Sequence, residues 1–433
     1  MKWTHALRNL LRNKRRTLAT GTAIAAGFVG LVLLGGYIYR VERLLFSQAV
    51  YLNFRGHISI FKTDSLENYA SSPAKFQITE DEISKVRVIL KEYDSKIEHM
   101  GYGMSGMGLV SNGQKSVPFQ ATGVDIETLS FTMHHPMVNK WSQDLLTADA
   151  IAYEEKARVN PHAISITSIM GELLDRKTPY ENLDEDSRSM QLAGMTIYSD
   201  LNAVNAEVMA SHSTGMEITE ETGLKAPLAL LQDLYQTSGA EFIAIYLKSP
   251  SRELSGLIRE LQKKIDDQGL PLEVFPYSDP RISPQYTGTM GFLYVMGAFF
   301  LFLISSAVVL SIINSLTMGI LERSKEIGTL RAIGYSEHQI AVGFMYESLG
   351  LSVICGTLGT IIAWIVAVIV NSLNIRFSPV GVSNSIQFVL TPNIVFILIA
   401  FALFTALVSI SSYGLVRKKL NLSIVDLLSD SGA

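Results

Sequence analysis

The sequence predicts an α-helical membrane protein with four transmembrane helices and a large α+β extracytoplasmic domain inserted between helices 1 and 2. The chain has 433 residues, of which 48% are hydrophobic and only 18% charged, against about 25% charged in an ordinary soluble domain. Four long segments carry no charged residue. Between Glu42 and Asp279 lie 34 of the 40 acidic and 21 of the 36 basic residues, so that stretch has a net charge of −13 and the remainder +9. This composition excludes a disordered chain and a simple soluble globule.

The charge-free segments predict the membrane spans. The first has 23 residues, and roughly 20 helical residues cross a bilayer core of about 30 Å. A cleaved signal peptide is the alternative, but the run is long for one and has no A-x-A-like cleavage site. The second run has 40 residues, about twice what a span needs, so part of it is expected to form a stalk. We expect spans at 17–39, 286–319 including the stalk, 341–370 and 393–416.

Basic residues predict the topology. They cluster before the first span, where an amphipathic cytoplasmic helix is expected over 1–16, and again in the tail 417–433. The positive-inside rule therefore places both termini in the cytoplasm. It follows that the domain 40–285 and the loop 371–392 lie outside, and that the connection 320–340 lies inside.

The external domain shows two β-α-β patterns around a middle segment. Near its start, 57–61 and 97–110 are expected strands that flank a helix at 79–93, whose Thr79 and Glu82 form a capping box. The residues 111–114 predict a hairpin turn. Near its end, strands at 241–247 and 272–275 flank a helix at 251–267. The middle, about 130–230, contains no recognisable motif and is expected to be an insertion of uncertain fold.

Candidate metal and catalytic sites are weak. Met100, Met104 and Met107, and the run Met133-His134-His135-Pro136-Met137, carry ligand types that suit copper, but flexible apolar contacts are the preferred interpretation. Cys355 is the single cysteine, so neither a disulfide nor a cysteine-based zinc site can form within one chain. We predict no metal site, no catalytic residues and no cofactor in this chain.

The cytoplasmic connection is the most informative segment. Residues 320–334 predict a short amphipathic helix in which Ile320, Ile327, Leu330 and Ile333 share an apolar stripe. Gly334 suits the position that ends this helix, and Ser336 with Gln339 forms a capping box that begins the next one. A rigid element of this kind at the membrane face can dock a cytoplasmic partner, although an interfacial helix without a partner is the alternative.

Polar and small residues within the spans carry further expectations. Glu347 places a carboxylate near hydrocarbon, where an unpaired charge is expensive, so we expect a structural or coupling ion pair there rather than proton relay. Small residues such as Gly27 in the first span and Gly356 and Gly359 in the third permit close helix approach. That approach occurs either within the chain or at a dimer seam.

The connection carries a family resemblance. The run from Glu322 to Gly334, followed by Ile340, Phe344 and Glu347, resembles the coupling region of FtsX-like and MacB-like ABC transporter permeases, the four-span mechanotransmission or type VII group. The segments 3–17 and 420–428 are similar to that family's ends, except that Leu422 stands where proline is usual. The segments 56–60 and 123–127 resemble most closely the lipoprotein-releasing LolC and LolE branch.

The resemblance implies a transport subunit that is not itself an enzyme. No Walker-type phosphate loop occurs in the chain, so ATP and Mg would be bound by separate cytoplasmic ABC ATPase subunits. Further implied partners are a second permease chain in a homo- or heterodimer, membrane lipids and a periplasmic protein, but no nucleic acid. The residues expected to couple to the ATPase are Glu322, Arg323, Glu326, Ile327, Gly328, Leu330, Arg331 and Gly334.

The implied function is extraction of a lipoprotein or another amphiphile from the bacterial inner membrane, driven by motion of the periplasmic domain. Two alternatives stay open: an FtsX-like signalling subunit that activates a periplasmic hydrolase, and a MacB-like efflux permease. The size of the external domain favours substrate handling over signalling alone.

Overall fold

The chain folds into two compact units. The computed structural model describes residues 14–69, 72–176, 180–249, 254–378 and 383–420. One unit is helical and contains the described parts of Met1–Val41, Gly291–Ile375 and Phe388–Ala433; the other is an α+β domain formed by Glu42–Met290 and Arg376–Gln387. The expected cytoplasmic helix lies, up to residue 13, outside the described residues, as does the tail from residue 421.

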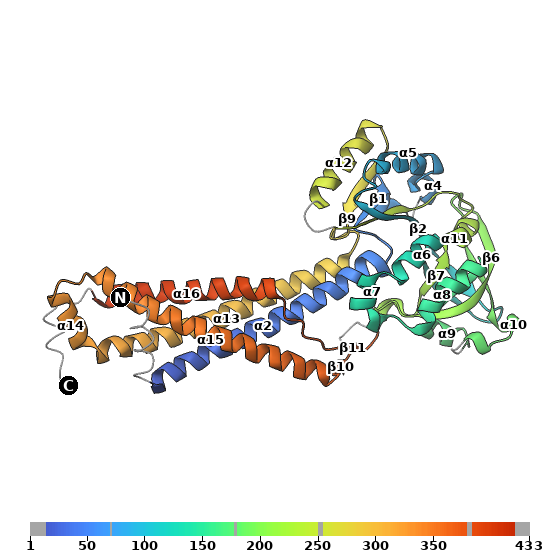
Figure 1. Ribbon diagram of the computed structural model, residues 1–433. Helices are drawn as coiled ribbons and strands as arrows, with labels where there is room; N and C mark the ends of the chain where they lie inside the picture. Colours follow the sequence, from blue (N-terminus) through green and yellow to red (C-terminus); the bar gives the residue numbers. More distant parts are fainter. Residues whose placement is uncertain (1–13, 70–71, 177–179, 250–253, 379–382, 421–433) are drawn as a thin grey trace. The chain divides into compact units, whose positions relative to one another are not determined.

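Four long helices confirm the predicted helical membrane fold (Figure 1). They are α2 (Lys14–Ser47), α13 (Pro284–Glu322), α15 (Glu337–Ser372) and α16 (Ile394–Leu420). Each is long and apolar enough to cross a bilayer. The helices α2 and α13 extend beyond the spans expected from charge alone, and α2 continues into a π-helical turn at Gln48–Leu52.

Small residues bring these helices together within the chain. A Cβ added to Gly359 of α15 would lie 2.6 Å from the carbonyl oxygen of Ala25 on α2, and one at Gly356 would lie 2.8 Å from the Phe28 ring. Phe28 in turn packs edge to face against Phe404 of α16, with ring centroids 4.8 Å apart. The glycines of the third span therefore serve packing inside this chain.

The helix expected over 320–334 is shorter than predicted. Residues Ser324–Ala332 form α14, and Arg323 interrupts the helix between α13 and α14 with φ −110° and ψ 17°. Gly334 adopts the positive φ of +98° that glycine tolerates best, which confirms its role at the end of α14. The Ser336–Gln339 capping box at the start of α15 is also confirmed.

Half of the α+β domain is a split β-α-β fold. The strands are β1 (Ile58–Lys62), β2 (Ile97–Ser111), β8 (Phe242–Leu247) and β9 (Leu272–Pro276), with α5 (Glu80–Lys91) and α12 (Leu254–Asp267) as the connecting helices. They pair antiparallel in the order β2-β8-β1-β9, the ferredoxin-like arrangement. Both predicted β-α-β patterns are therefore present and interleave in one sheet. The capping box of α5 at Thr79 and Glu82 is confirmed.

The middle segment completes a closed barrel. It contributes β4 (Ala163–Thr167), β5 (Ser189–Met195), β6 (Leu201–His212) and β7 (Gly223–Pro227), and β3 (Ser116–Val124) precedes it. They pair in the order β3-β7-β4-β6-β5-β2, and β3 also pairs with β2 across the predicted hairpin, so the ring closes. The segment that the sequence left as an insertion of uncertain fold is thus the larger part of a six-stranded barrel.

One strand belongs to both halves. The amino-terminal part of β2 pairs with β8, and from Gly103 onward β2 pairs with β3. Packing is tight along it, because a side chain at Gly103 would overlap the Phe242 ring and one at Gly106 would overlap Tyr235. Glycine is therefore needed where the two halves share this strand.

Shorter elements complete the domain. The remaining helices are α3 (Ser65–Asn68), α4 (Pro73–Phe76), α6 (Ile126–Met133), α7 (Pro136–Trp141), α8 (Ala148–Val159), α9 (Ser168–Leu173), α10 (Glu185–Arg188) and α11 (Leu228–Tyr235). Part of the expected external loop 371–392 also belongs here: β10 (Arg376–Phe377) pairs with β11 (Ile386–Gln387), and Arg376 forms an ion pair with Asp144 at 3.2 Å.

Candidate functional site

The helix break at Arg323 is held by a buried ion pair. Arg323 Nη1 donates to Glu347 Oε2 at 3.3 Å, and Nη2 donates to Oε1 at 3.5 Å. The residues are 8% and 7% exposed. This two-point geometry is specific to arginine and a carboxylate. Glu347 of α15, for which the sequence predicted a partner, is therefore paired with the residue that separates α13 from α14.

The predicted coupling residues divide into exposed, buried and half-buried groups. Glu322, Glu326 and Gly334 are exposed, whereas Ile327 and Gly328 are buried with Arg323. Leu330 and Arg331 are half-buried; Leu330 packs on an apolar cluster, and Arg331 forms an ion pair with Glu337 at 3.0 Å. Only the exposed group can meet a partner directly, and the buried group can act on it by holding the helix in place.

Several exposed residues on this segment were missed by the sequence analysis. The expected apolar stripe is interior at Ile320 and Ile327, but Ile333 is 70% exposed. Leu321 and Tyr335 are also exposed large apolar side chains. We call the exposed set the α14 surface: Leu321, Glu322, Lys325, Glu326, Ile333 and Tyr335. The 3.6-residue period placed Ile333 on one stripe with Ile320 and Ile327, but α14 ends at Ala332, so Ile333 does not share their burial.

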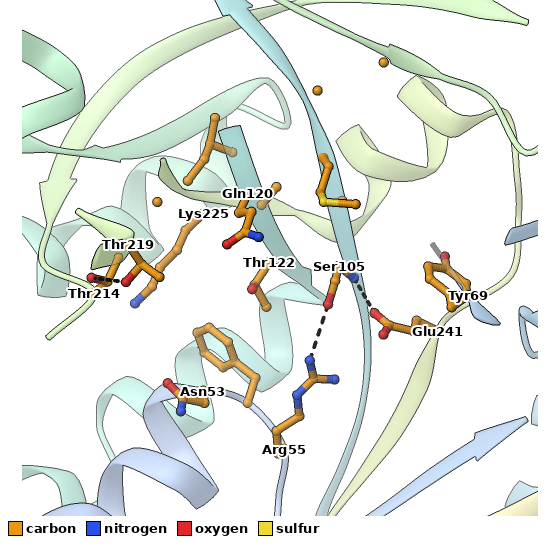
Figure 2. A pocket seen from close by; sticks show the side chains of 18 of the residues that line it. Asn53, Arg55, Tyr69, Ser105, Gln120, Thr122, Thr214, Thr219, Lys225 and Glu241 are labelled. Atoms are coloured by element: carbon orange, nitrogen blue, oxygen red, sulfur yellow. Dashed lines mark hydrogen bonds between the residues drawn. The ribbon is translucent and has the colours of Figure 1, made fainter. Parts of the chain in front are cut away.

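A large cavity lies within the α+β domain (Figure 2). Its volume is about 1010 Å³, and its walls come from the turn after α2, from β2, β3 and β7, and from the ends of β5 and β6. Pockets for small organic molecules occupy about 300–1,000 Å³. No local sequence pattern predicts this cavity, because its walls come from segments far apart in the chain.

Arg55 reaches this cavity from a strained turn. Phe54 and Gly56, on either side of it, have φ values of +58° and +67°, and the left-handed region is unfavourable for a bulky residue such as phenylalanine. The guanidinium lies 4.1 Å from the centroid of the Phe242 ring, and its Nη2 donates to Ser105 Oγ at 3.3 Å. Its Nη1 is buried and has no hydrogen-bond partner within the described part of the chain. Burial lowers the pKa of Arg55.

Lys225 of β7 provides a second cation. Its ammonium lies 5.4 Å from the centroid of the Phe54 ring, and none of the described residues forms an ion pair or a hydrogen bond with it. Burial lowers the pKa of Lys225 to about 8, against the opposing effect of Glu220. Lys225 is half-buried, and a charge that is partly removed from water without an ion pair is unfavourable.

The nearby carboxylates are already engaged. Glu241 Oε2 accepts the backbone N–H of Ser105 at 2.7 Å. Glu220 Oε1 accepts the backbone N–H of Thr214 at 2.8 Å and the hydroxyls of Ser213 and Ser383 at 2.6 and 2.7 Å. Glu241 Oε2 and Glu220 Oε1 thus already accept hydrogen bonds, whereas Arg55 Nη1 has no acceptor among the described residues.

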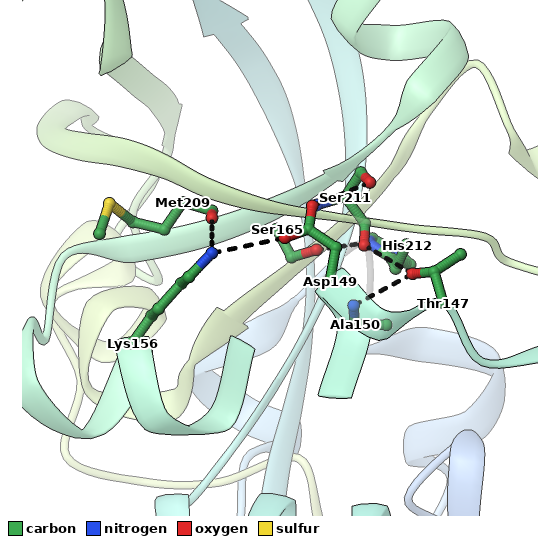
Figure 3. A network of polar contacts seen from close by, with 8 residues as sticks. All are labelled: Thr147, Asp149, Ala150, Lys156, Ser165, Met209, Ser211 and His212. Atoms are coloured by element: carbon green, nitrogen blue, oxygen red, sulfur yellow. Dashed lines mark hydrogen bonds and ion pairs between the residues drawn. The ribbon is translucent and has the colours of Figure 1, made fainter. Parts of the chain in front are cut away.

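A polar network beside the cavity is structural (Figure 3). Asp149 at the start of α8 accepts the backbone N–H of Ser211 at 2.6 Å and its hydroxyl at 3.0 Å, and pairs with Lys156 at 3.4 Å. Ser165 Oγ lies 2.9 Å from His212 Nδ1, and both residues are buried. Burial holds the pKa of His212 well below its usual range. These contacts fasten α8 to β6, and β6 to β4.

The candidate metal ligands do not converge. His135 Nδ1 accepts the backbone N–H of Met137 at 3.2 Å, and its ring stacks on Tyr51. His134 bonds instead to the carbonyl oxygen of Ser130. Met104 is buried in the barrel core, whereas Met107 is exposed. Across the described ranges, no group of three or more His, Cys, Asp or Glu side chains could hold a metal ion.

Comparisons with known proteins identify the carboxyl-terminal part of the chain. No protein of curated function matches the sequence. The periplasmic region of MacB from Actinobacillus actinomycetemcomitans is similar over 53% of this chain and 92% of that one, with 12% identity and a TM-score of 0.34. The extracellular domain of the noncanonic ABC-type transporter YknZ from Gram-positive bacteria is similar over 50% and 98%, with 16% identity and a TM-score of 0.31. Residues 298–424 match the family described as FtsX-like permease C-terminal, so this part of the chain is similar to FtsX-like permeases.

Proposed function

We propose that this chain is the permease subunit of an ABC transporter and that a separate cytoplasmic ATPase, which binds ATP and Mg, drives it. The observation that carries the proposal is the FtsX-like match over 298–424, which includes the α14 surface and the Arg323–Glu347 pair. In this proposal both termini and α14 are cytoplasmic, the α+β domain is periplasmic, and the membrane is the bacterial inner membrane.

The geometry supports a mechanical role for α14. An ATPase that pushes on the α14 surface moves a short helix that is separated from α13 by one non-helical residue, Arg323. Because Arg323 is bonded to Glu347, the displacement passes to α15 as well as to α13. The helix α13 has 39 residues, about 58 Å at 1.5 Å per residue, and begins at Pro284 in the α+β unit. A tilt of α13 at one end therefore displaces its other end.

The covalent connections support transmission through more than one helix. The segment Arg376–Gln387, between α15 and α16, belongs to the α+β unit, where Arg376 pairs with Asp144 and Ser383 bonds to Glu220. The chain therefore passes between the two units four times. We propose that motion of α15 also reaches the α+β domain by this route.

The cargo proposed is a lipoprotein or another amphiphile, extracted at the outer face of the membrane as in the LolC and LolE branch. The cavity in the α+β domain favours substrate handling over pure signalling. A dimer of permease chains with two ATPase chains completes the proposed assembly.

Purification and ATPase measurements test the proposal. The full chain should co-purify with a nucleotide-hydrolysing partner encoded nearby in the genome. Glu326→Lys and Ile333→Glu on the α14 surface should each weaken that association at least tenfold or abolish substrate-stimulated ATP hydrolysis. Glu80→Lys, on an exposed position of α5, is the matched control and should change neither. Normal coupling in both α14 variants would contradict docking at this surface, and failure to find any ATPase partner would contradict the proposed function.

A further inference from the structure

The cavity of the α+β domain is lined by both apolar and cationic side chains. Four exposed apolar side chains from β2, β5 and β6 line it: Met107, Leu109, Met195 and Leu201. We call them the apolar rim. Exposed apolar side chains that line one cavity are typical of a site for an apolar ligand or partner. The interior holds Arg55 and Lys225 (Figure 2).

Two nitrogens at the cavity, Arg55 Nη1 and the Lys225 ammonium, have no protein acceptor among the described residues. Arg55 Nη1 is buried without a hydrogen-bond partner among the residues described. The Lys225 ammonium contacts the Phe54 ring, and in the described ranges no carboxylate lies within ion-pair distance of it. Leaving a buried donor such as Arg55 Nη1 unsatisfied is unfavourable, and more so when the donor is charged. A ligand with anionic oxygens would supply the acceptors that the fold does not.

The backbone conformation on either side of Arg55 positions its side chain at the cavity. Phe54 occupies the left-handed region at φ +58°, and strain of this kind persists where surrounding structure enforces it, often at ligand sites. A Cβ at Gly56 would lie 2.7 Å from the carbonyl oxygen of Ile245, so the backbone is pressed against β8. These contacts fix the direction in which Arg55 leaves the chain.

From this arrangement we infer that the cavity binds an anionic amphiphile, with its negatively charged head group between Arg55 and Lys225 and its hydrocarbon chain along the apolar rim. The site would take a single-chain lipid or the acylated end of a larger molecule that bears a phosphate, sulfonate or carboxylate. The inference deepens the proposed function by naming a substrate class, and its transport consequence rests on that function. The binding itself does not, because no ATPase is needed for it.

Calorimetric titration tests the inference on the full chain. The protein is placed in nanodiscs of zwitterionic phosphatidylcholine, and heats from empty nanodiscs are subtracted. Decanesulfonate supplies a permanently charged head group with a chain, decanol the chain alone, and inorganic sulfate the anion alone. We expect decanesulfonate to bind at least tenfold more tightly than either of the others. Equal affinity for decanol or for sulfate would overturn the inference.

Variants locate the site. Lys225→Met and Arg55→Met should each weaken decanesulfonate binding about tenfold to a hundredfold, in keeping with loss of a charge-assisted hydrogen bond. Lys85→Met, at an exposed lysine of α5 that pairs with Asp81, removes the same charge elsewhere and should leave binding unchanged. Undiminished binding in both cavity variants would overturn the inference.

Two further variants distinguish a loss of binding from a loss of folding. Lys225→Arg keeps the charge and should retain most of the affinity. Thr122→Phe adds bulk to the cavity wall beside both cations and should weaken decanesulfonate at least tenfold with little effect on thermal stability. If Thr122→Phe bound normally, the chain could not lie in this cavity. A normal ATPase association together with failed binding would reject the inference and leave the proposed function standing.

Discussion

Arg323 and Glu347 form a two-point ion pair, at 3.3 and 3.5 Å, that joins the break between α13 and α14 to the third long helix. Both side chains are buried. A buried pair of this kind contributes little net stability relative to apolar residues, but removing one partner leaves the other charge buried and unpaired. The pair is therefore well suited to fixing the position of α14, which the apolar contacts of a nine-residue helix would fix less specifically.

Removal of one partner should be much more harmful than removal of both. Glu347→Gln or Arg323→Met should destabilise the helical unit by about 3–5 kcal/mol, because the remaining charge is buried and unpaired. The double variant Arg323→Met, Glu347→Leu should recover most of that stability. Thermal unfolding of the purified protein measures both. A double variant as unstable as the single ones would show that the pair does not act as a unit.

The same double variant separates stability from coupling. If the pair transmits motion from α14 to α15, the stable double variant should still lose at least half of the substrate-stimulated ATPase activity of the assembled transporter. Full activity would assign the pair a packing role only.

Close packing between α2 and α15 depends on Gly359. Gly359→Leu forces a side chain against the backbone of Ala25, and overpacking of this kind typically costs about 1–3 kcal/mol. We expect a lower unfolding temperature in detergent. Gly414→Leu in α16 is the matched control, because a Cβ there meets no atom of the described chain within 4 Å. Equal effects of the two variants would contradict close packing at Gly359.

Lys225 should lower the stability of the α+β domain. Burial lowers the pKa of its ammonium from 10.5 to about 8 in the folded chain. Between pH 8 and 10.5 the unfolded chain therefore binds more protons than the folded one, and folding stability should rise with pH across this window. Lys225→Met should abolish that rise.

At pH 7 the same substitution should raise the unfolding temperature by about 2–4 °C for each kcal/mol gained. Thermal unfolding of wild type and variant at pH 7, 8, 9 and 10 measures both effects. A variant that is less stable than wild type at pH 7 would contradict the cost assigned to the buried charge.

Ligand binding in the cavity should depend on pH in the opposite direction. Decanesulfonate keeps its charge at every pH used, so its affinity reports the protein. The groups facing Lys225 are Glu220, which favours the charged ammonium, and His212, which is neutral because burial depresses its pKa. Affinity should be constant below pH 8 and fall as the pH rises through about 8. Lys225→Arg should remove this dependence up to pH 10, and a fall of the same size in that variant would assign the titration to another group.

Local patterns in the sequence were sufficient for much of the fold. The charge-free segments predicted the four long helices, and the Thr79–Glu82 and Ser336–Gln339 capping boxes predicted where α5 and α15 begin; both boxes are present. These features depend on residues close together in the chain. The barrel was not predictable in the same way, because β4 is buried along its whole length and shows no alternation, and its partners β6 and β7 lie about 40 to 60 residues away in the sequence.

Hydrophobicity, charge and capping residues act over a few positions, and they were enough to predict a membrane protein with four long helices, a large acidic α+β domain and a capped segment after the second long helix. The folded chain was needed to show that Arg323 is the partner of Glu347, that Ile333 is exposed, and that Arg55 and Lys225 share a cavity with the apolar rim. These relationships depend on where strands and helices distant in sequence meet, and on the balance between burying a charge and supplying its partner, which no local pattern contains.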